Sequence, residues 1–205
     1  MRRVIAVGIV AVFACLDASW QVLAQQPSSD GPRYATDGKL LRPADYREWM
    51  FLTAGLGMTY GPAAGPSVAA PRFDNVFVNP SAYRHFMKTG AWPDKTMFIL
   101  EIRTSASEGS INRDGHFQTG LAAIEAAVKD EARFPDKWAY FNFGAGANIR
   151  ESVDALPKTA TCYTCHSQNT AVENTFVQFY PTLFEVARTK GTVKPSYNPT
   201  PAPQN

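Results

Sequence analysis

The chain has 205 residues, a formal net charge of +2 at neutral pH, three cysteines and three histidines. This length suits a single folded domain once the two ends are set aside. After the first residues the chain has no basic run, which argues against nucleic acid and against an anionic membrane surface as partners.

The segment over residues 1–24 has the pattern of a secretory signal peptide. A pair of arginines precedes the apolar run Val4–Ala14, and Val22-Leu23-Ala24 forms a V-x-A cleavage site. The apolar run is too short to span a bilayer. We therefore predict cleavage after Ala24, loss of Cys15 with the signal, a periplasmic location and no membrane attachment of the mature protein.

The rest of the chain divides by composition into three parts. Residues 25–39 are polar and rich in Pro, Gly and Ser, which predicts a flexible arm. Residues 192–205 are rich in proline and have no core-forming pattern, which predicts a disordered tail. Residues 40–191 lie between them and are predicted to form the folded domain.

The first half of this domain mixes short helices with strands. In chain order we predict a helix over Pro43–Trp49, a strand from Met50–Thr53, a loop over Gly61–Pro71, a strand over Phe73–Val78 and a helix over Pro80–Lys88. Asn79 precedes Pro80 in the manner of an N-cap before Pro at the first helical position. Gly90 is expected to end this helix in a left-handed conformation.

The second half contains one ambiguous segment. The predicted elements are a strand over Thr96–Arg103, a polar loop over Ser105–Asn112, a strand over Trp138–Phe143 and a helix over Asn174–Arg188. Gly120–Lys129 is rich in Ala and Glu, which favours helix, yet it lies between turn signals in a strand-rich region. Pro181 is expected to break or kink the last helix.

Residues Thr161–His166 read T-CYTCH and contain the CxxCH signature of covalent c-type haem attachment. Cysteines three residues apart lie on one side of a helical turn, so each can add to one vinyl group of the same haem. The histidine that follows can offer an imidazole nitrogen to the iron. We therefore predict one covalently bound haem c, with Cys162 and Cys165 as thioether attachments and His166 as the proximal iron ligand.

Two other interpretations of this motif are weaker. A structural zinc site requires further Cys or His ligands at similar spacing, and the mature chain has no other cysteine. A thioredoxin-like redox motif is expected near a βαβ pattern, which this sequence lacks, and it does not need the trailing histidine.

Several stretches around the motif together resemble the cytochrome P-460 family, which also includes the cytochromes c′-beta. The resemblance extends over Leu40 to Gly191. The stretches are Tyr46–Trp49, Phe77–Tyr83, Lys88–Gly90, Ala127–Asp130, Arg133–Pro135, Trp138–Phe141, the CxxCH motif and Phe176–Pro181.

The resemblance implies an α+β fold, with a mainly antiparallel β-sheet, a few short helices and the haem packed against one face of the sheet. It implies that Gly120–Lys129 is a strand, that the protein is a homodimer and that the iron is five-coordinate. The position opposite His166 is then open to a small molecule.

Two functions are implied by this family. The P-460 members oxidise hydroxylamine, pass electrons to a periplasmic acceptor and carry a lysine cross-link to the haem. The c′-beta members lack the cross-link and bind nitric oxide or other small gases. Lys88 matches the cross-linking position, although a lysine at a helix C-terminus is also favoured by the helix dipole alone.

The resemblance also implies a distal carboxylate that accepts protons from hydroxylamine. It is expected after the Trp138–Phe141 strand, but the stretch Asn142–Ala147 has no acidic residue. Glu151 and Asp154 are the nearest acids, and each can equally be a surface residue.

Other side chains are candidates for the remaining positions around the iron, each with a structural interpretation as well. A second axial ligand is possible at His85, His116, Met58, Met87 or Met97, and a His/Met pair predicts a simple electron carrier. Aromatic candidates for the distal face, which can equally pack a core, are Phe77, Phe98, Phe141 and Phe143.

Overall fold

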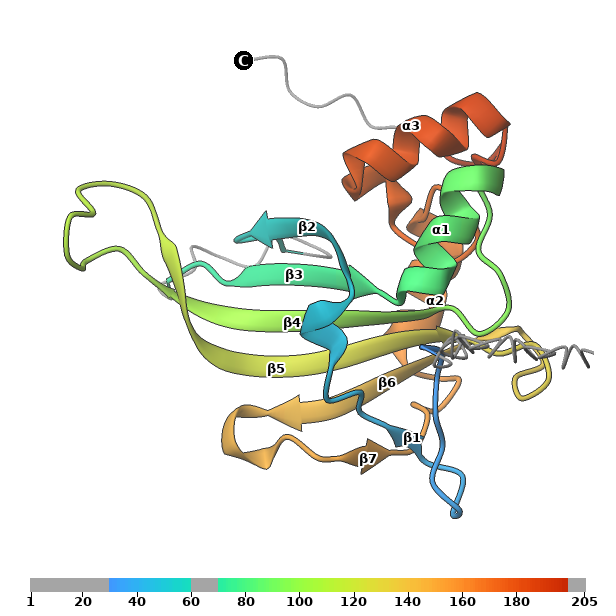
Figure 1. Ribbon diagram of the computed structural model, residues 1–205, viewed down its shortest axis with the longest axis horizontal. Helices are drawn as coiled ribbons and strands as arrows, with labels where there is room; N and C mark the ends of the chain where they lie inside the picture. Colours follow the sequence, from blue (N-terminus) through green and yellow to red (C-terminus); the bar gives the residue numbers. More distant parts are fainter. Residues whose placement is uncertain (1–29, 60–69, 199–205) are drawn as a thin grey trace, which may run out of the picture.

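A five-stranded antiparallel sheet forms the centre of the computed structural model, which describes residues 30–59 and 70–198 (Figure 1). The strands lie in the order β2-β3-β4-β5-β6, so each pairs with its neighbours in the sequence. Their bounds are Met50–Leu56 for β2, Phe73–Val78 for β3, Met97–Ala106 for β4, Phe117–Lys129 for β5 and Trp138–Ala145 for β6. The predicted α+β class with a mainly antiparallel sheet is confirmed.

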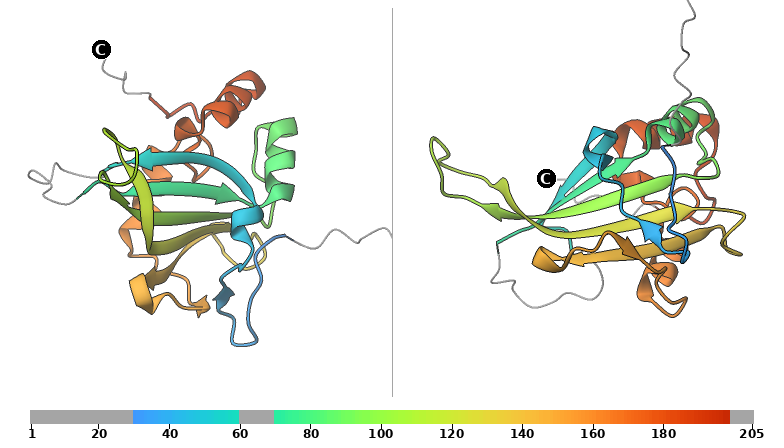
Figure 2. Two further views of the ribbon diagram at one scale, coloured as in Figure 1. Left: turned by 60° about the vertical axis from the view of Figure 1, so that its left-hand side comes forward. Right: turned by 60° about the horizontal axis from the view of Figure 1, so that its bottom comes forward.

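Short elements surround this sheet. α1 and α3 pack together at one end of it, α2 lies behind it in the view of Figure 1, and the hairpin between β4 and β5 projects from the other end (Figures 1 and 2). The helices are α1 (Pro80–Thr89), α2 (Thr161–Asn169) and α3 (Pro181–Lys190), with 3-10 turns η1 (Tyr46–Glu48), η2 (Gly146–Asn148) and η3 (Val177–Phe179). A small second sheet pairs β1 (Leu40–Leu41) with β7 (Ser152–Val153).

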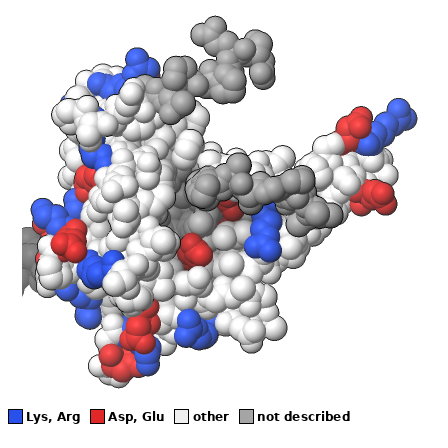
Figure 3. Space-filling model, turned by 180° about the vertical axis from the view of Figure 1, so that it is seen from behind, with Lys and Arg blue, Asp and Glu red and all other residues white. Residues whose placement is uncertain are grey.

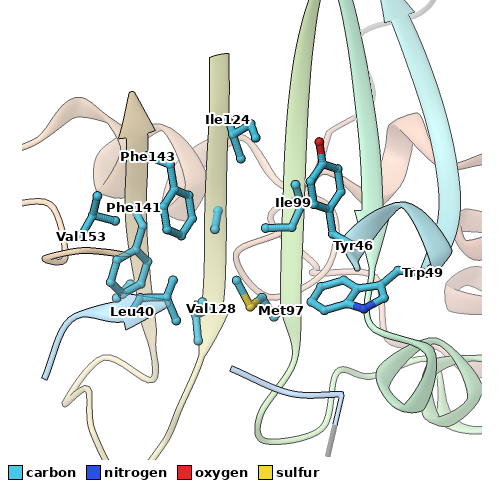
Figure 4. Packing of buried hydrophobic residues seen from close by; sticks show 12 residues of the cluster. Leu40, Tyr46, Trp49, Met97, Ile99, Ile124, Val128, Phe141, Phe143 and Val153 are labelled. Atoms are coloured by element: carbon cyan, nitrogen blue, oxygen red, sulfur yellow. The ribbon is translucent and has the colours of Figure 1, made fainter. Parts of the chain in front are cut away.

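Alternate residues of a strand point to opposite sides, so the main sheet has two separate faces. Different elements cover each of them. On the first face, η1 and the small sheet enclose a core that includes Tyr46, Ile99 and Phe143 (Figure 4). On the second face, α1 and α3 pack over Val78 and Phe98. This leaves the rest of the second face available to α2.

The segment Gly120–Lys129, whose composition favours helix, is part of strand β5. It pairs with β4 along one edge and with β6 along the other. Because a central strand is hydrogen-bonded on both edges and packed on both faces, these non-local contacts outweigh the helical preference of Ala and Glu. The strand implied by the family resemblance is therefore confirmed, and the helix favoured by composition is wrong.

Helix α1 is capped by a residue from the N-terminal arm. It begins after Asn79 and ends at Gly90 with a φ of 74°, as predicted. The side chain of Asn79 makes no cap, however, because its Oδ1 accepts a hydrogen bond from Met97 N at 2.8 Å. The carboxylate of Asp30 instead accepts one from Ser81 N at 2.7 Å. Asp30 lies in the segment predicted to be flexible, so part of that arm is bound to the domain.

The C-terminal side also differs from the prediction. Pro181 does not break a long helix but begins α3, because its missing N–H is not needed at the first helical position. Beyond residue 191, the N–H of Lys194 donates to Ala171 O at 2.8 Å, and the ring of Tyr197 packs on Phe184. The predicted disordered tail therefore packs against the domain as far as Tyr197.

Several predictions fall outside the described residues. These are the signal peptide, residues 25–29 of the arm, most of the predicted loop over Gly61–Pro71, and residues 199–205 of the tail. Among the described residues, no helix is long and apolar enough to cross a bilayer.

Candidate haem site

The CxxCH motif forms the first two turns of α2, on the second face of the sheet. Cys162 and Cys165 lie one turn apart on the same side of this helix. Both cysteines and His166 line a cavity of about 300 Å³ between α2 and the sheet. Both thiols are free of disulfide bonds. The structure thus brings together the three residues that the motif assigns to haem binding.

The second face of the sheet forms the opposite wall of this cavity. Strand pairing places the wall residues in two rows, Val76-Leu100-Glu125 and Phe98-Ala127-Tyr140. The rows are apolar apart from the Glu125 carboxylate and the Tyr140 hydroxyl, and the ring of Phe176 adds a further apolar wall. An apolar slot with a few polar groups suits a large flat macrocycle.

The imidazole of His166 is held by a hydrogen bond and by two aromatic rings. Its Nδ1 lies 2.8 Å from the carbonyl oxygen of Asn174. Because a carbonyl only accepts, Nδ1 carries the proton and Nε2 keeps a lone pair for a metal. The rings of Tyr140 and Phe176 flank the imidazole, with centroids 4.4 and 4.6 Å away. Burial lowers the pKa of His166, although the hydrogen bond to Asn174 opposes this, so the neutral ligating form is favoured.

The cavity fits a covalently bound haem on two further observations. The hydroxyl of Tyr140 is buried and has no hydrogen-bond partner in the described part of the chain. An unpaired buried hydroxyl is costly, and a polar group of a bound cofactor would relieve this cost. In addition, Tyr163 inside the motif packs edge-on against Tyr140 and donates to Leu156 O, which fastens α2 to β6 and the segment after it.

Two carboxylates in the cavity wall were missed by the sequence analysis. Glu125 on β5 and Asp74 on β3 both line the cavity. Burial raises the pKa of Asp74, with Arg72 opposing the shift. Burial also raises the pKa of Glu125, and the negative charge of Asp74 adds to this effect. Glu125 in turn raises the pKa of the Cys162 thiol, after the larger effect of burial, so this carboxylate lies close to the attachment helix.

The sequence could have indicated Glu125 as a cavity residue only if the ambiguous segment Gly120–Lys129 had been taken as a strand. When Gly120–Lys129 is a strand, Ala123, Glu125 and Ala127 share one face, and an acid on a face of small residues points to a buried role. The two acids nearest the expected position lie at the surface, which is one of the two interpretations that the sequence left open. Neither Glu151 nor Asp154 lines the cavity; Glu151 pairs with Arg42, and both acids are exposed.

Lys88 is not brought to the cavity. It lies exposed on the last turn of α1, and no lysine is among the cavity-lining residues in the described part of the chain. His85 on the same helix and His116 in the projecting hairpin are exposed and lie outside the lining as well. The predicted cross-link therefore has no support in this geometry, and neither histidine is placed as a second ligand.

The candidate methionines and phenylalanines divide between the two faces of the sheet. Met58 lines the cavity, whereas Met97 is buried in the core of the first face and Met87 packs with α1 and α3. Phe98 lines the cavity, whereas Phe77 and Phe143 belong to the first-face core. Phe141 also packs in that core, although part of the residue borders the cavity. Met58 is thus the candidate sixth ligand, and Phe98 the candidate for an aromatic wall.

The surface on the α2 side carries mixed charge. Figure 3 shows Lys and Arg interspersed with Asp and Glu, and no extended area of one sign on the part of this face that is not grey. A polyanion such as nucleic acid binds clustered positive charge, which this visible face does not present.

A comparison with protein families agrees with the geometry. The model of the family described as Cytochrome P460 matches residues 43–177, which is well over half of the chain. The matched range contains the CxxCH motif, the Asn174 carbonyl and both carboxylates of the cavity. No match was found among curated proteins.

Proposed function

Because the chain belongs to the cytochrome P460 family, we propose that it oxidises hydroxylamine at a haem held by His166, with Glu125 as proton acceptor. Membership makes the chain a c-type cytochrome of the P460 and c′-beta kind. We propose in addition that hydroxylamine is the substrate, that it is oxidised, and that Glu125 accepts its protons.

The residues on α2 hold the cofactor. Cys162 and Cys165 would form thioether bonds to one haem c, and Nε2 of His166 would bind its iron. When bound, the haem would supply an iron site for hydroxylamine and for the uptake of its electrons. Tyr140 and Phe176 keep the imidazole plane fixed, and the Asn174 carbonyl holds its Nδ1 proton.

The carboxylate pair is the observation that carries the proposal. Oxidation of hydroxylamine removes protons as well as electrons from N–H and O–H bonds, so a base in the site speeds the reaction. Glu125 and Asp74 line the same cavity as His166, and their raised pKa values bring them nearer to neutral pH than exposed carboxylates. A base with a pKa closer to the working pH is the more effective proton acceptor.

A second function is favoured by different observations. The rest of the cavity wall is apolar, and Lys88 lies outside it. Both features suit a c′-beta type protein that binds nitric oxide without turning it over. In that case the carboxylates only make the pocket polar, and hydroxylamine is not consumed.

Steady-state turnover distinguishes the two functions. We expect the purified holoprotein to consume hydroxylamine with an artificial electron acceptor present, and the acceptor to be reduced in proportion. A protein heated to denaturation is the control for free haem. Tight binding of nitric oxide without hydroxylamine consumption would replace the proposal with gas binding. Resistance of the iron to both molecules would instead indicate a six-coordinate electron carrier, with Met58 as the second ligand.

The state of Lys88 is tested by mass analysis of the digested holoprotein. Because Lys88 is exposed on α1 and absent from the cavity wall, we expect haem on the peptide with Cys162 and Cys165 only. The peptide that contains Lys88 should appear at its unmodified mass. The proposed oxidation would then differ from that of the P-460 members in proceeding without the cross-link. A species that joins both peptides through haem would show that α1 moves toward the cavity when haem is attached.

We also propose that the protein acts in the periplasm, as a homodimer, and passes electrons to a periplasmic redox protein. The location is supported by the CxxCH motif, because c-type haem is attached outside the bacterial cytoplasm, and by the leader-like pattern of residues 1–24. The homodimer and the electron acceptor rest on the family resemblance alone.

A further inference from the structure

The turn that follows α2 holds the hydrogen-bond partner of the axial histidine. The Nδ1 of His166 donates to the carbonyl of Asn174, which lies in the turn over residues 170–175. The strength of this bond depends on where the turn places the carbonyl. A group that anchors the turn therefore acts on the histidine without touching the cofactor.

Glu173, next to Asn174, is the principal anchor of this turn. Its Oε1 accepts the backbone N–H of Trp92 at 3.0 Å. Its Oε2 accepts from Lys129 Nζ at 2.8 Å and from Trp138 Nε1 at 3.3 Å. The carboxylate thus links the turn to the segment before β4 and to the ends of β5 and β6.

The partners of Glu173 are themselves rigid. Trp92 and Trp138 are buried, and the side chain of Lys129 is 9% exposed. Lys129 Nζ also donates to Trp92 O at 2.7 Å, so lysine, tryptophan and glutamate form a closed set of contacts. Charged hydrogen bonds between partly buried groups are stronger than neutral ones, which makes this a firm attachment.

The backbone of the turn is strained at the same residue. Glu173 has a φ of 47°, in the left-handed region that non-glycine residues rarely adopt. Such a conformation is unfavourable for a residue with a Cβ and persists where surrounding contacts hold it. Thr175 adds one of these contacts, since its Oγ1 accepts Trp92 Nε1 at 2.8 Å. The strain therefore lies at the anchoring residue itself, next to the residue whose carbonyl faces His166.

We propose that Glu173 is a positioning residue for His166, acting through the turn that carries the Asn174 carbonyl. The inference rests on His166 as the iron ligand and holds whether the site oxidises hydroxylamine or binds a gas. A strong Nδ1–H···O bond makes the imidazole a better electron donor to a metal. Loosening the turn weakens that bond and makes His166 a weaker donor.

The test is the substitution Glu173→Gln in the holoprotein. The amide is isosteric, but both carboxylate oxygens accept hydrogen bonds, so in either orientation its NH2 faces a donor: Trp92 N–H on one side, or Lys129 and Trp138 on the other. The turn must therefore shift. We expect the iron–histidine stretching frequency of the reduced protein to fall, in resonance Raman spectra. The reduction potential should become more positive, because a weaker donor stabilises the oxidised iron less. Hydroxylamine turnover is not needed for either readout, so the inference can fail while the proposed function stands.

A matched control separates positioning from general stability. Glu101 is likewise a carboxylate with cationic partners, and it is more deeply buried than Glu173, but it lies on the first face of the sheet, away from His166. Glu101→Gln should lower stability and leave the iron–histidine frequency and the potential unchanged. Equal spectral shifts in the two variants would overturn the proposal.

A second variant keeps the test valid if Glu173→Gln does not accumulate. The double variant Glu173→Gln with Lys129→Met removes both charges and the donor clash with lysine, so folding is expected. Its iron–histidine frequency should still lie below that of the unmodified protein. Where the single variant also folds, the double variant should show the smaller shift. An unchanged frequency and potential in the double variant would show that Glu173 does not position His166.

Discussion

Replacing Glu125 with glutamine is expected to slow hydroxylamine turnover by about 10²- to 10⁴-fold, the usual contribution of a general base. Glutamine keeps the shape of the side chain but cannot accept a proton. Glu125 lies in the cavity wall and is not one of the residues assigned to haem attachment, so the haem content and the nitric oxide affinity of the variant should change little. The measurement is the turnover number at saturating hydroxylamine, with haem absorbance as the control.

The pH dependence of turnover is a second test of Glu125 as the proton acceptor. The carboxylate must be ionised to act as a base, so activity should fall as the pH drops through its raised pKa. The negative charge of Asp74 contributes to that raised value. In the variant Asp74→Asn, the pKa of Glu125 should therefore decrease, and the acidic limb of the profile should move to lower pH.

Glu151→Gln is the matched control for both measurements. This acid is exposed, pairs with Arg42 and lies outside the cavity lining. Glu151→Gln should change neither the turnover number nor the acidic limb of the pH profile. If Glu125→Gln retains full turnover and an unchanged pH profile, Glu125 is not the proton acceptor, and gas binding becomes the better explanation of the site.

The largest stability effect is expected from Glu101→Gln, at about 3 kcal/mol of the unfolding free energy. The Glu101 carboxylate is buried between β3 and β5 and pairs with Arg103 Nε at 2.6 Å and Arg47 Nε at 2.8 Å. It also accepts a hydrogen bond from the buried hydroxyl of Tyr46. The amide cannot replace the charge, so two guanidinium groups lose their partner. Denaturant unfolding of the holoprotein measures the difference.

The same carboxylate makes stability depend on pH. Although burial opposes ionisation, hydrogen bonds from Arg103, Tyr46 and Arg47 lower the pKa of Glu101 to about 2 in the folded protein, from an ordinary value of 4.5. A depressed pKa means that the stabilisation is fully present above 4.5 and is lost as the pH falls toward 2. Glu101→Gln should remove this part of the acid sensitivity.

Glu151→Gln again supplies the comparison, because an exposed ion pair contributes about 0 to 1 kcal/mol. If Glu101→Gln lowers the unfolding free energy no more than Glu151→Gln does, the cluster around Glu101 does not stabilise the fold. An unchanged acid sensitivity would point to other carboxylates as its source.

Local signals in the sequence were sufficient for some elements. The strand Phe73–Val78 and the helix after Asn79, ended by Gly90, agree with the structure because side-chain pattern and turn chemistry act within a few residues. Gly120–Lys129 shows the limit of this reasoning. Its helical composition is overridden by pairing with two strands, and that pairing depends on residues elsewhere in the chain.

By itself, the sequence was sufficient to identify the three residues of the CxxCH motif as one local group. Cys162, Cys165 and His166 lie within one helix, so their spacing alone brings them together. Their neighbours also supported the family assignment, which the matching family model confirms.

Only the tertiary structure decided what surrounds His166. Asp74 and Glu125 reach one cavity through the register of β3, β4 and β5, while Lys88 is left outside it on α1. The Asn174 carbonyl meets His166 because Glu173 is tied to distant strands. Strand register and long-range hydrogen bonds arise only when the whole chain is packed, so no local pattern could have predicted these contacts.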